Sequence, residues 1–171
     1  RGTASGMAAV FASLACQLKA GDRIVSSDAL FGSCQFILAE ILPKWGVECV
    51  FVDGRDNDAW AKALSKPTKT VFLETPSNPS LRLVDLETVS KLAHAAGATV
   101  VVDNVFATPL LQQPLKQGAD VVVYSATKHI DGQGRTLGGV ILGTQKFITE
   151  TLQPFLRHTG PSLSPMNAWV L

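Results

Sequence analysis

Short runs of β-branched residues alternate along the chain with longer stretches of helical period. Six such runs predict β-strands: Arg23–Ser26, Glu48–Val52, Thr70–Leu73, Thr99–Val102, Asp120–Tyr124 and Val140–Leu142. Two of the stretches between them have apolar residues three and four positions apart, which predicts amphipathic helices over Phe31–Trp45 and Asp85–Ala96. Because strands and helices alternate and the strands are almost continuously apolar, we expect an α/β fold with a mostly parallel sheet buried on both faces.

The composition narrows the class of protein further. The chain has 171 residues, of which 46 % are hydrophobic and 17 % charged, so one domain with a sizeable core is expected. A net charge of +1 provides no strong field for nucleic acid or a membrane surface, and neither partner is expected. The three cysteines fit no metal or redox motif, which favours buried free thiols in a reducing cytoplasm and no metal site.

The two ends of the sequence suggest a longer polypeptide. The chain opens on RGTASGMAAVF, already inside a motif, and stops on PMNAWVL, inside a helical pattern. We therefore expect residues 1–171 to be part of a larger protein.

Polar residues collect where the predicted strands end. They are Ser27-Asp28, Asp53, Glu74-Thr75, Asp103-Asn104 and Ser125-Ala126-Thr127-Lys128. In open α/β sheets the ligand lies outside the carboxyl ends of the strands. The pattern predicts a site at this edge of the sheet, but it names no reaction.

Lys128 is the candidate nucleophile in this set. A lysine directly after a strand can simply extend to solvent. Here Ser125 and Thr127 flank it, and a partly desolvated amine loses proton affinity and attacks carbonyls more readily. The Ser-x-x-Lys spacing also matches an acylating motif of penicillin-binding serine enzymes, but its Ser-x-Asn and Lys-Thr-Gly partner motifs are absent. A solvated lysine and a covalent role for its amine both remain open.

Each of four other segments has both a purely structural and a functional interpretation. Ser5-Gly6-Met7 starts a helical stretch, so it is either an ordinary cap or a phosphate site built on free N–H groups. Asp103 is either a cap or a carboxylate that needs a cation in a dry site. Phe31 is either a core residue or an aromatic ring stacked on a planar ligand. Asn78 is either a turn residue or a hydrogen-bond donor into the site.

Taken together, the functional interpretations describe a single ligand. A nucleophilic lysine, a carboxylate for a ring nitrogen, a phosphate cradle, an aromatic ring and an amide donor are the parts that pyridoxal 5'-phosphate (PLP) needs. We therefore predict PLP as the cofactor.

The order of the motifs adds a family resemblance. SGMAA, LFGS, ETPSNP, VVDNVFATP and SATKHIDGQGRTLGG follow one another through nearly the whole chain. In this the chain resembles the Cys/Met-metabolism PLP-dependent enzymes of the cystathionine γ-synthase type. The resemblance implies the PLP-dependent transferase fold of the aspartate-aminotransferase type (fold type I). Residues 1–171 would be its large PLP-binding domain, without the N-terminal segment and the C-terminal domain.

The resemblance also implies a role for each matched residue. Lys128 would form the Schiff base with the cofactor, and Asp103 would pair with its pyridine nitrogen. Asn78 would contact the ring's 3-oxygen, and Phe31 would stack on the ring where most members have a tyrosine. Phosphate ligands would be the backbone N–H groups of Gly6 and Met7 and the hydroxyls of Ser125 and Thr127. Val105 stands where most members have a threonine, so one polar contact near the aspartate is absent.

The stretch KHIDGQGR is most similar to the O-succinylhomoserine sulfhydrylase branch of this family. That branch implies γ-replacement on O-succinyl-L-homoserine by sulfide, giving homocysteine and succinate in methionine biosynthesis. It also implies a cytoplasmic homodimer or homotetramer with shared active sites. Alternatives within the family are a cystathionine γ-synthase, an O-acetylhomoserine sulfhydrylase or a methionine γ-lyase. The alternative from another class is a non-catalytic α/β ligand-binding domain.

Overall fold

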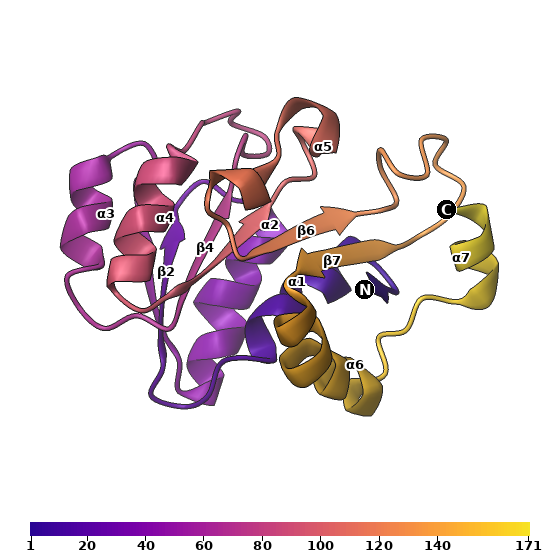
Figure 1. The fold of residues 1–171 in the computed structure, drawn as a ribbon, viewed down its shortest axis with the longest axis horizontal. Coiled ribbons are helices and arrows are strands. Elements are labelled where there is room, and N and C mark those ends of the chain that lie inside the picture. Colours follow the sequence, from indigo (N-terminus) through magenta and orange to yellow (C-terminus); the bar gives the residue numbers. More distant parts are fainter.

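The computed structural model describes all residues from 1 to 171 and contains one seven-stranded sheet (Figure 1). The strands follow the order β1-β7-β6-β5-β4-β2-β3 across the sheet. β2 to β6 are parallel to one another, whereas β7 runs antiparallel to β6 and β1 antiparallel to β7. The strands are β1 Gly2–Thr3, β2 Arg23–Ser27, β3 Glu48–Val52, β4 Thr70–Glu74, β5 Thr99–Asp103, β6 Val121–Ser125 and β7 Gly139–Gly143. The predicted α/β fold with a mostly parallel sheet is confirmed.

Helices cover both faces of this sheet, as Figure 1 shows. The α-helices are α1 Gly6–Ala15, α2 Gly32–Phe36, α3 Asn57–Ala63, α4 Leu86–Ala95, α5 Thr108–Leu111, α6 Gln153–Thr159 and α7 Pro165–Val170. Tighter or wider helical turns occupy Ile37–Ile41, Leu42–Trp45, Pro114–Gln117 and Phe147–Leu152. No helix is both long enough and apolar enough to cross a membrane.

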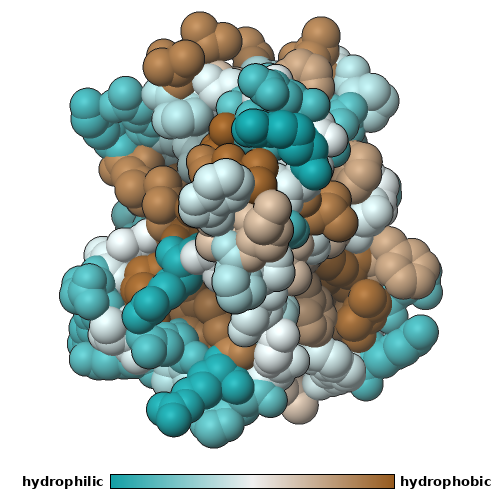
Figure 2. All heavy atoms as spheres, turned by 90° about the vertical axis from the view of Figure 1, so that its right-hand side faces the viewer, coloured by the Kyte–Doolittle hydropathy of each residue, from teal (hydrophilic) through white to brown (hydrophobic).

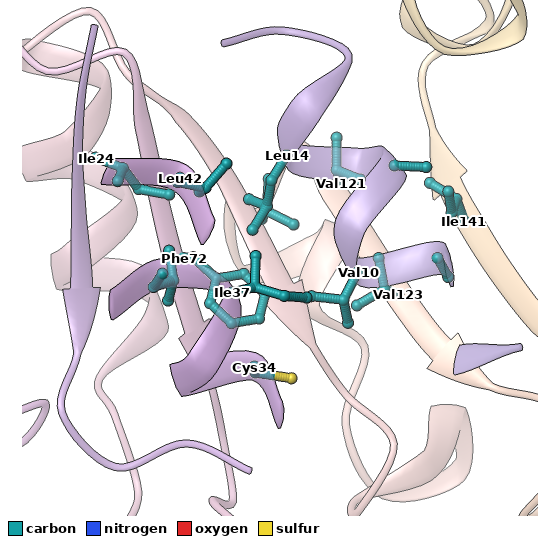
Figure 3. Packing of buried hydrophobic residues seen from close by; sticks show 14 of the residues in the cluster. Val10, Leu14, Ile24, Cys34, Ile37, Leu42, Phe72, Val121, Val123 and Ile141 are labelled. Atoms are coloured by element: carbon teal, nitrogen blue, oxygen red, sulfur yellow. The ribbon is translucent and has the colours of Figure 1, made fainter. Parts of the chain in front are cut away.

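Two hydrophobic clusters hold the three layers together, one on each face of the sheet. One lies between the sheet and the layer of α1 and α2, and the other lies between the sheet and the layer of α3 and α4. In the first cluster, Val10 and Leu14 of α1 lie over Val121, Val123 and Ile141 of β6 and β7 (Figure 3). Both clusters draw alternate residues from the same strands, which explains why the strands are apolar on both faces.

The predicted elements are found with small changes at their boundaries. All six predicted strands are present, and the helix predicted over Asp85–Ala96 is α4, where Asp85 caps the helix by accepting the N–H of Thr88. The helix predicted over Phe31–Trp45 is less regular, because Pro43 has no N–H to continue the helical ladder. β1 was not predicted; its two residues form a strand only by pairing with β7. The cysteines are free, but only Cys34 is buried.

Candidate functional site

Three polar residues end the central strands on the same face of the sheet. Glu74, Asp103 and Ser125 are the last residues of β4, β5 and β6. Side chains along a strand alternate between the two faces, so residues two positions apart share a face. Phe72, Val101 and Val123 belong to the hydrophobic cluster beneath α1. Each of them lies two positions before one of the three polar residues. The three side chains are therefore directed toward the layer that contains α1.

A cavity of about 330 Å³ opens at this edge of the sheet. Its lining includes every residue that the family resemblance assigned to the cofactor, namely Gly6, Met7, Phe31, Asn78, Asp103, Ser125, Thr127 and Lys128. The structure thus brings the predicted residues together from five separate segments of the chain. Their individual roles remain predictions.

The start of α1 forms one wall of the cavity. Ser5 caps the helix, because its Oγ accepts the N–H of Ala8 at 3.1 Å. The first N–H groups of a helix, here those of Gly6 and Met7, have no acceptor within the helix. Gly6 also lies against β6: a Cβ at this position would be 2.6 Å from the Cβ of Ser125. The absence of a side chain therefore lets these donors and the Ser125 hydroxyl converge on one space.

A tight turn after β6 positions the lysine. The N–H of Lys128 donates to the carbonyl of Ser125 at 3.2 Å, and Thr127 Oγ1 accepts the N–H of Gly138 at 3.1 Å. The ammonium group of Lys128 makes no ion pair and no side-chain hydrogen bond. The side chain is exposed, so residues 1–171 alone do not provide the desolvation that the sequence suggested for this amine.

Asp103 lies at the floor of the cavity and is only 6 % exposed. Its Oδ1 accepts the N–H of Val105 at 3.0 Å, so Val105 contacts the aspartate through its backbone although it lacks a hydroxyl. No arginine or lysine pairs with this carboxylate. Burial raises the pKa of Asp103 to about 6. The cation that a dry carboxylate requires is thus not supplied by the chain itself.

Glu74 is a residue of this site that sequence reasoning did not single out. It is 3 % exposed, and it lies beside Asp103 in the register of β4 and β5. Its Oε2 accepts the N–H of Phe31 at 2.6 Å, and its Oε1 accepts the N–H of Asn78 at 3.1 Å. Burial and the neighbouring Asp103 carboxylate raise the pKa of Glu74 to about 7. The sequence named Glu74 only as one of the polar residues at the strand ends, and that pattern assigned it no role.

Phe31 and Asn78 face the cavity from opposite loops. The ring of Phe31 is 43 % exposed and lines the cavity, so the interpretation of Phe31 as a core residue is wrong. The side-chain amide of Asn78 makes no hydrogen bond within the chain, although its backbone is held by Glu74. Both side chains are therefore free to contact a ligand.

Asn104 was predicted only as one of the polar residues at the strand ends, and it organises the loop that follows β5. It is fully buried, and its Nδ2 donates to Tyr124 Oη at 2.9 Å and to the carbonyl of Gln112 at 3.0 Å. Its Oδ1 accepts from Gln112 Nε2 at 2.8 Å. Asn104 thereby fixes the end of β5, where Asp103 lies, against β6.

Comparison with known proteins decides the family. The model of a family described as Cys/Met metabolism PLP-dependent enzyme matches residues 2–171. The chain belongs to this family. It is 64 % identical over 169 residues to the O-succinylhomoserine sulfhydrylase of Mycobacterium tuberculosis, a match that covers 99 % of this chain and 42 % of that protein. The chain thus spans less than half the length of this relative.

Solved structures agree with the family. A crystal structure of metB from Corynebacterium glutamicum superposes with a TM-score of 0.95 at 37 % identity, covering 99 % of this chain and 44 % of that one. A putative O-acetylhomoserine (thiol)-lyase from Campylobacter jejuni, solved with N'-pyridoxyl-lysine-5'-monophosphate, has a TM-score of 0.92 at 31 % identity, covering 99 % of this chain and 50 % of that one. The fold is that of the fold type I PLP-dependent enzymes.

The residues of the cavity fit the cofactor of this family. PLP combines an aldehyde, a basic ring nitrogen and a phosphate, and each has a chemical counterpart here. An unpaired lysine amine, a buried carboxylate without a cation and a helix start brought close by Gly6 line the same space. The donor set therefore matches PLP.

Proposed function

We propose that this cavity binds PLP and that the full polypeptide is an O-succinylhomoserine sulfhydrylase. The observation that supports it best is the meeting of an unpaired lysine amine and a buried carboxylate without a cation in one cavity. The reaction is γ-replacement: sulfide displaces succinate from the γ-carbon of O-succinyl-L-homoserine, so the bond from the γ-carbon to the ester oxygen is replaced by a carbon–sulfur bond and homocysteine is formed. The similarity to a sulfhydrylase supports this choice of substrate.

Each part of the cofactor has a proposed ligand. The N–H groups of Gly6 and Met7 and the hydroxyls of Ser125 and Thr127 hold the phosphate, because oriented donors at a helix start favour an anion. The other ligands act on the ring: Asp103 keeps a proton on its nitrogen, Phe31 lies against its face, and the amide of Asn78 donates to its 3-oxygen. Lys128 attaches the cofactor through its amine.

The same residues carry out the proton transfers. When bound, PLP supplies an electron sink for the carbanion chemistry of amino acids. Lys128 Nζ would act as the base that removes the α-proton of the substrate, and it would then move a β-proton. Asp103 would balance the positive charge on the ring nitrogen. Lys128 would also be the residue that holds the cofactor between turnovers.

Other features belong to the whole polypeptide. We propose that residues 1–171 are its large PLP-binding domain and that the group gripping the substrate carboxylate lies elsewhere in the protein, consistent with a match that covers 42 % of the relative. We also propose a cytoplasmic homo-oligomer with shared active sites. Exposed apolar side chains such as Leu110, Leu111 and Trp169 support an interface. Figure 2 shows apolar patches between polar residues on the side of α6 and α7.

The choice of substrates is tested on the full-length protein. O-succinyl- and O-acetyl-homoserine are each assayed with sulfide and with cysteine, and methionine is assayed alone. We expect the succinyl ester with sulfide to have the highest kcat/KM. A preference for cysteine would instead indicate a cystathionine γ-synthase, and a preference for the acetyl ester an O-acetylhomoserine sulfhydrylase. Breakdown of methionine as the fastest reaction would indicate a γ-lyase.

The role of Lys128 is tested by colour. We expect a yellow protein whose visible absorbance band is bleached by borohydride. The reduced cofactor should then be found covalently attached to Lys128. Lys128→Ala should lose both the band and the turnover, whereas Lys146→Ala, at an exposed lysine outside the cavity, should keep both. A colourless wild type would favour the non-catalytic ligand-binding domain.

A further inference from the structure

One buried carboxylate joins the two loops that face the cavity. Glu74 uses both oxygens, one for the N–H of Phe31 at 2.6 Å and one for the N–H of Asn78 at 3.1 Å. These N–H groups belong to the segment before α2 and to the loop after β4, and both residues line the cavity. We propose that Glu74 is a positioning residue whose ionised carboxylate clamps the Phe31 and Asn78 segments around the cavity. That the clamped ligand is PLP rests on the proposed function.

The clamp depends on the charge of Glu74. A backbone N–H can only donate, and an ionised carboxylate accepts at both oxygens. Protonation turns one oxygen into a hydroxyl, so one of the two N–H groups loses a strong acceptor. The ionised form therefore holds both segments, and the protonated form holds one of them well.

Three titratable groups surround Glu74, and Asp103 has the largest effect. Asp103 lies beside it on β5, and its negative charge opposes ionisation of Glu74. Burial raises the pKa of the Cys34 thiol in α2, and the nearby carboxylates of Asp103 and Glu74 raise it further. Lys128 lines the cavity from the side of β6. A cation placed next to Asp103 would offset the repulsion and favour ionised Glu74, so filling the cavity and clamping the segments reinforce each other.

Hydrogen exchange of the full-length protein without PLP tests the clamp itself. The protection factor, which removes the intrinsic effect of pH on exchange, is measured for the amides of Phe31 and Asn78. For local openings in which Glu74 stays buried beside Asp103, we expect these factors to fall about tenfold from about pH 8 to about pH 6, either side of the Glu74 pKa of about 7. In Glu74→Gln they should be about tenfold lower at the higher pH and should not respond to pH, because the amide nitrogen would face a donor.

Matched variants separate the clamp from general destabilisation. Glu48→Gln removes an exposed carboxylate on β3 in the same isosteric way, and it should leave both protection factors unchanged. Asp103→Asn removes the repulsion and should move the midpoint of the pH response to lower pH. Wild-type protection in Glu74→Gln, or a flat pH response in the wild type, would overturn the proposal. The wild-type pH series decides the question even if Glu74→Gln does not fold.

A titration with PLP, followed by its visible absorbance, tests the link to the cavity. We expect Glu74→Gln to bind PLP about tenfold more weakly than the wild type, and Glu48→Gln to bind it normally. Unchanged affinity in Glu74→Gln would show that clamping and filling are not coupled. A wild type that binds no PLP would reject the proposed function, and the exchange experiment would still decide whether Glu74 is a clamp.

Discussion

At the scale of single residues, the absence of a Cβ on Gly6 lets helix α1 approach the end of β6 closely. Helix α1 meets the end of β6 so closely that a Cβ on Gly6 would lie 2.9 Å from the Cα of Ser125, which is backbone and cannot turn away. Tight packing of this kind resists the addition of even one methyl group. The position of the free N–H groups therefore depends on this glycine.

The first prediction concerns Gly6→Ala. The methyl group should push the start of α1 away from Ser125, lower the affinity for PLP at least about tenfold and destabilise the fold by about 1–3 kcal/mol. PLP titration and denaturant unfolding measure the two effects. Gly32→Ala is the matched control, because Gly32 also begins a helix and its Cβ would meet nothing within 4 Å. Equal behaviour of the two variants would contradict the packing argument.

The sequence identified some site residues and missed others for a physical reason. Asp103 and Lys128 stand out because each ends or follows an apolar run, a pattern that is visible without the fold. The importance of Glu74 comes from hydrogen bonds to residues 43 and 4 positions away in the sequence. Only the fold brings those N–H groups to it, so a polar residue at a strand end could not be distinguished from an ordinary cap.

At the scale of elements, the ends of β5 and β6 are joined by side-chain hydrogen bonds. Asn104 follows β5, and its Nδ2 donates a hydrogen bond to Tyr124 Oη of β6. Its side-chain Oδ1 accepts a hydrogen bond from Gln112 Nε2. Asn104 and Tyr124 are buried, and an unpaired polar atom is costly there. Helix α4 could be predicted from its period, whereas this network could not, because it depends on how two strands and a loop meet.

The second prediction therefore concerns Asn104→Ala. Removing the amide leaves several buried groups without partners, so the free energy of unfolding should fall by about 3 kcal/mol or more. Denaturant unfolding measures it. Tyr124→Phe is the graded control: it removes one hydroxyl from the same network and should cost about 1 kcal/mol. A smaller loss in Asn104→Ala than in Tyr124→Phe would contradict this role for Asn104.

At the scale of the whole molecule, two buried carboxyl groups make stability depend on pH. The pKa of Glu74 is raised from 4.5 to about 7, and that of Asp103 from 3.8 to about 6. In both cases the folded protein binds the proton more tightly than the unfolded chain does. Their contribution is therefore present at low pH and is lost as pH rises through the folded pKa values.

The third prediction follows from that sign. In the absence of PLP, the free energy of unfolding of the full-length protein should fall by on the order of 3 kcal/mol between about pH 4 and about pH 7. Denaturant unfolding across this range measures it. Asp103→Asn should make the free energy of unfolding depend less on pH, because it removes one of the two carboxyl groups and lowers the pKa of the other, Glu74. A stability that rises steadily over the same range would contradict the assignment.

The pairing of β1 with β7 has a consequence for how the protein is made. Gly2 pairs with Val140, and Gly6 packs against Ser125, so early residues of this segment contact residues far along the sequence, and the cavity lining extends from Ser5 to Leu137. Contacts between such distant parts form late, because a long loop must close first. A nascent chain that has not yet released Ser125 to Leu137 from the ribosome therefore lacks part of the cavity lining. The cofactor can be captured only once most of residues 1–171 have emerged and folded.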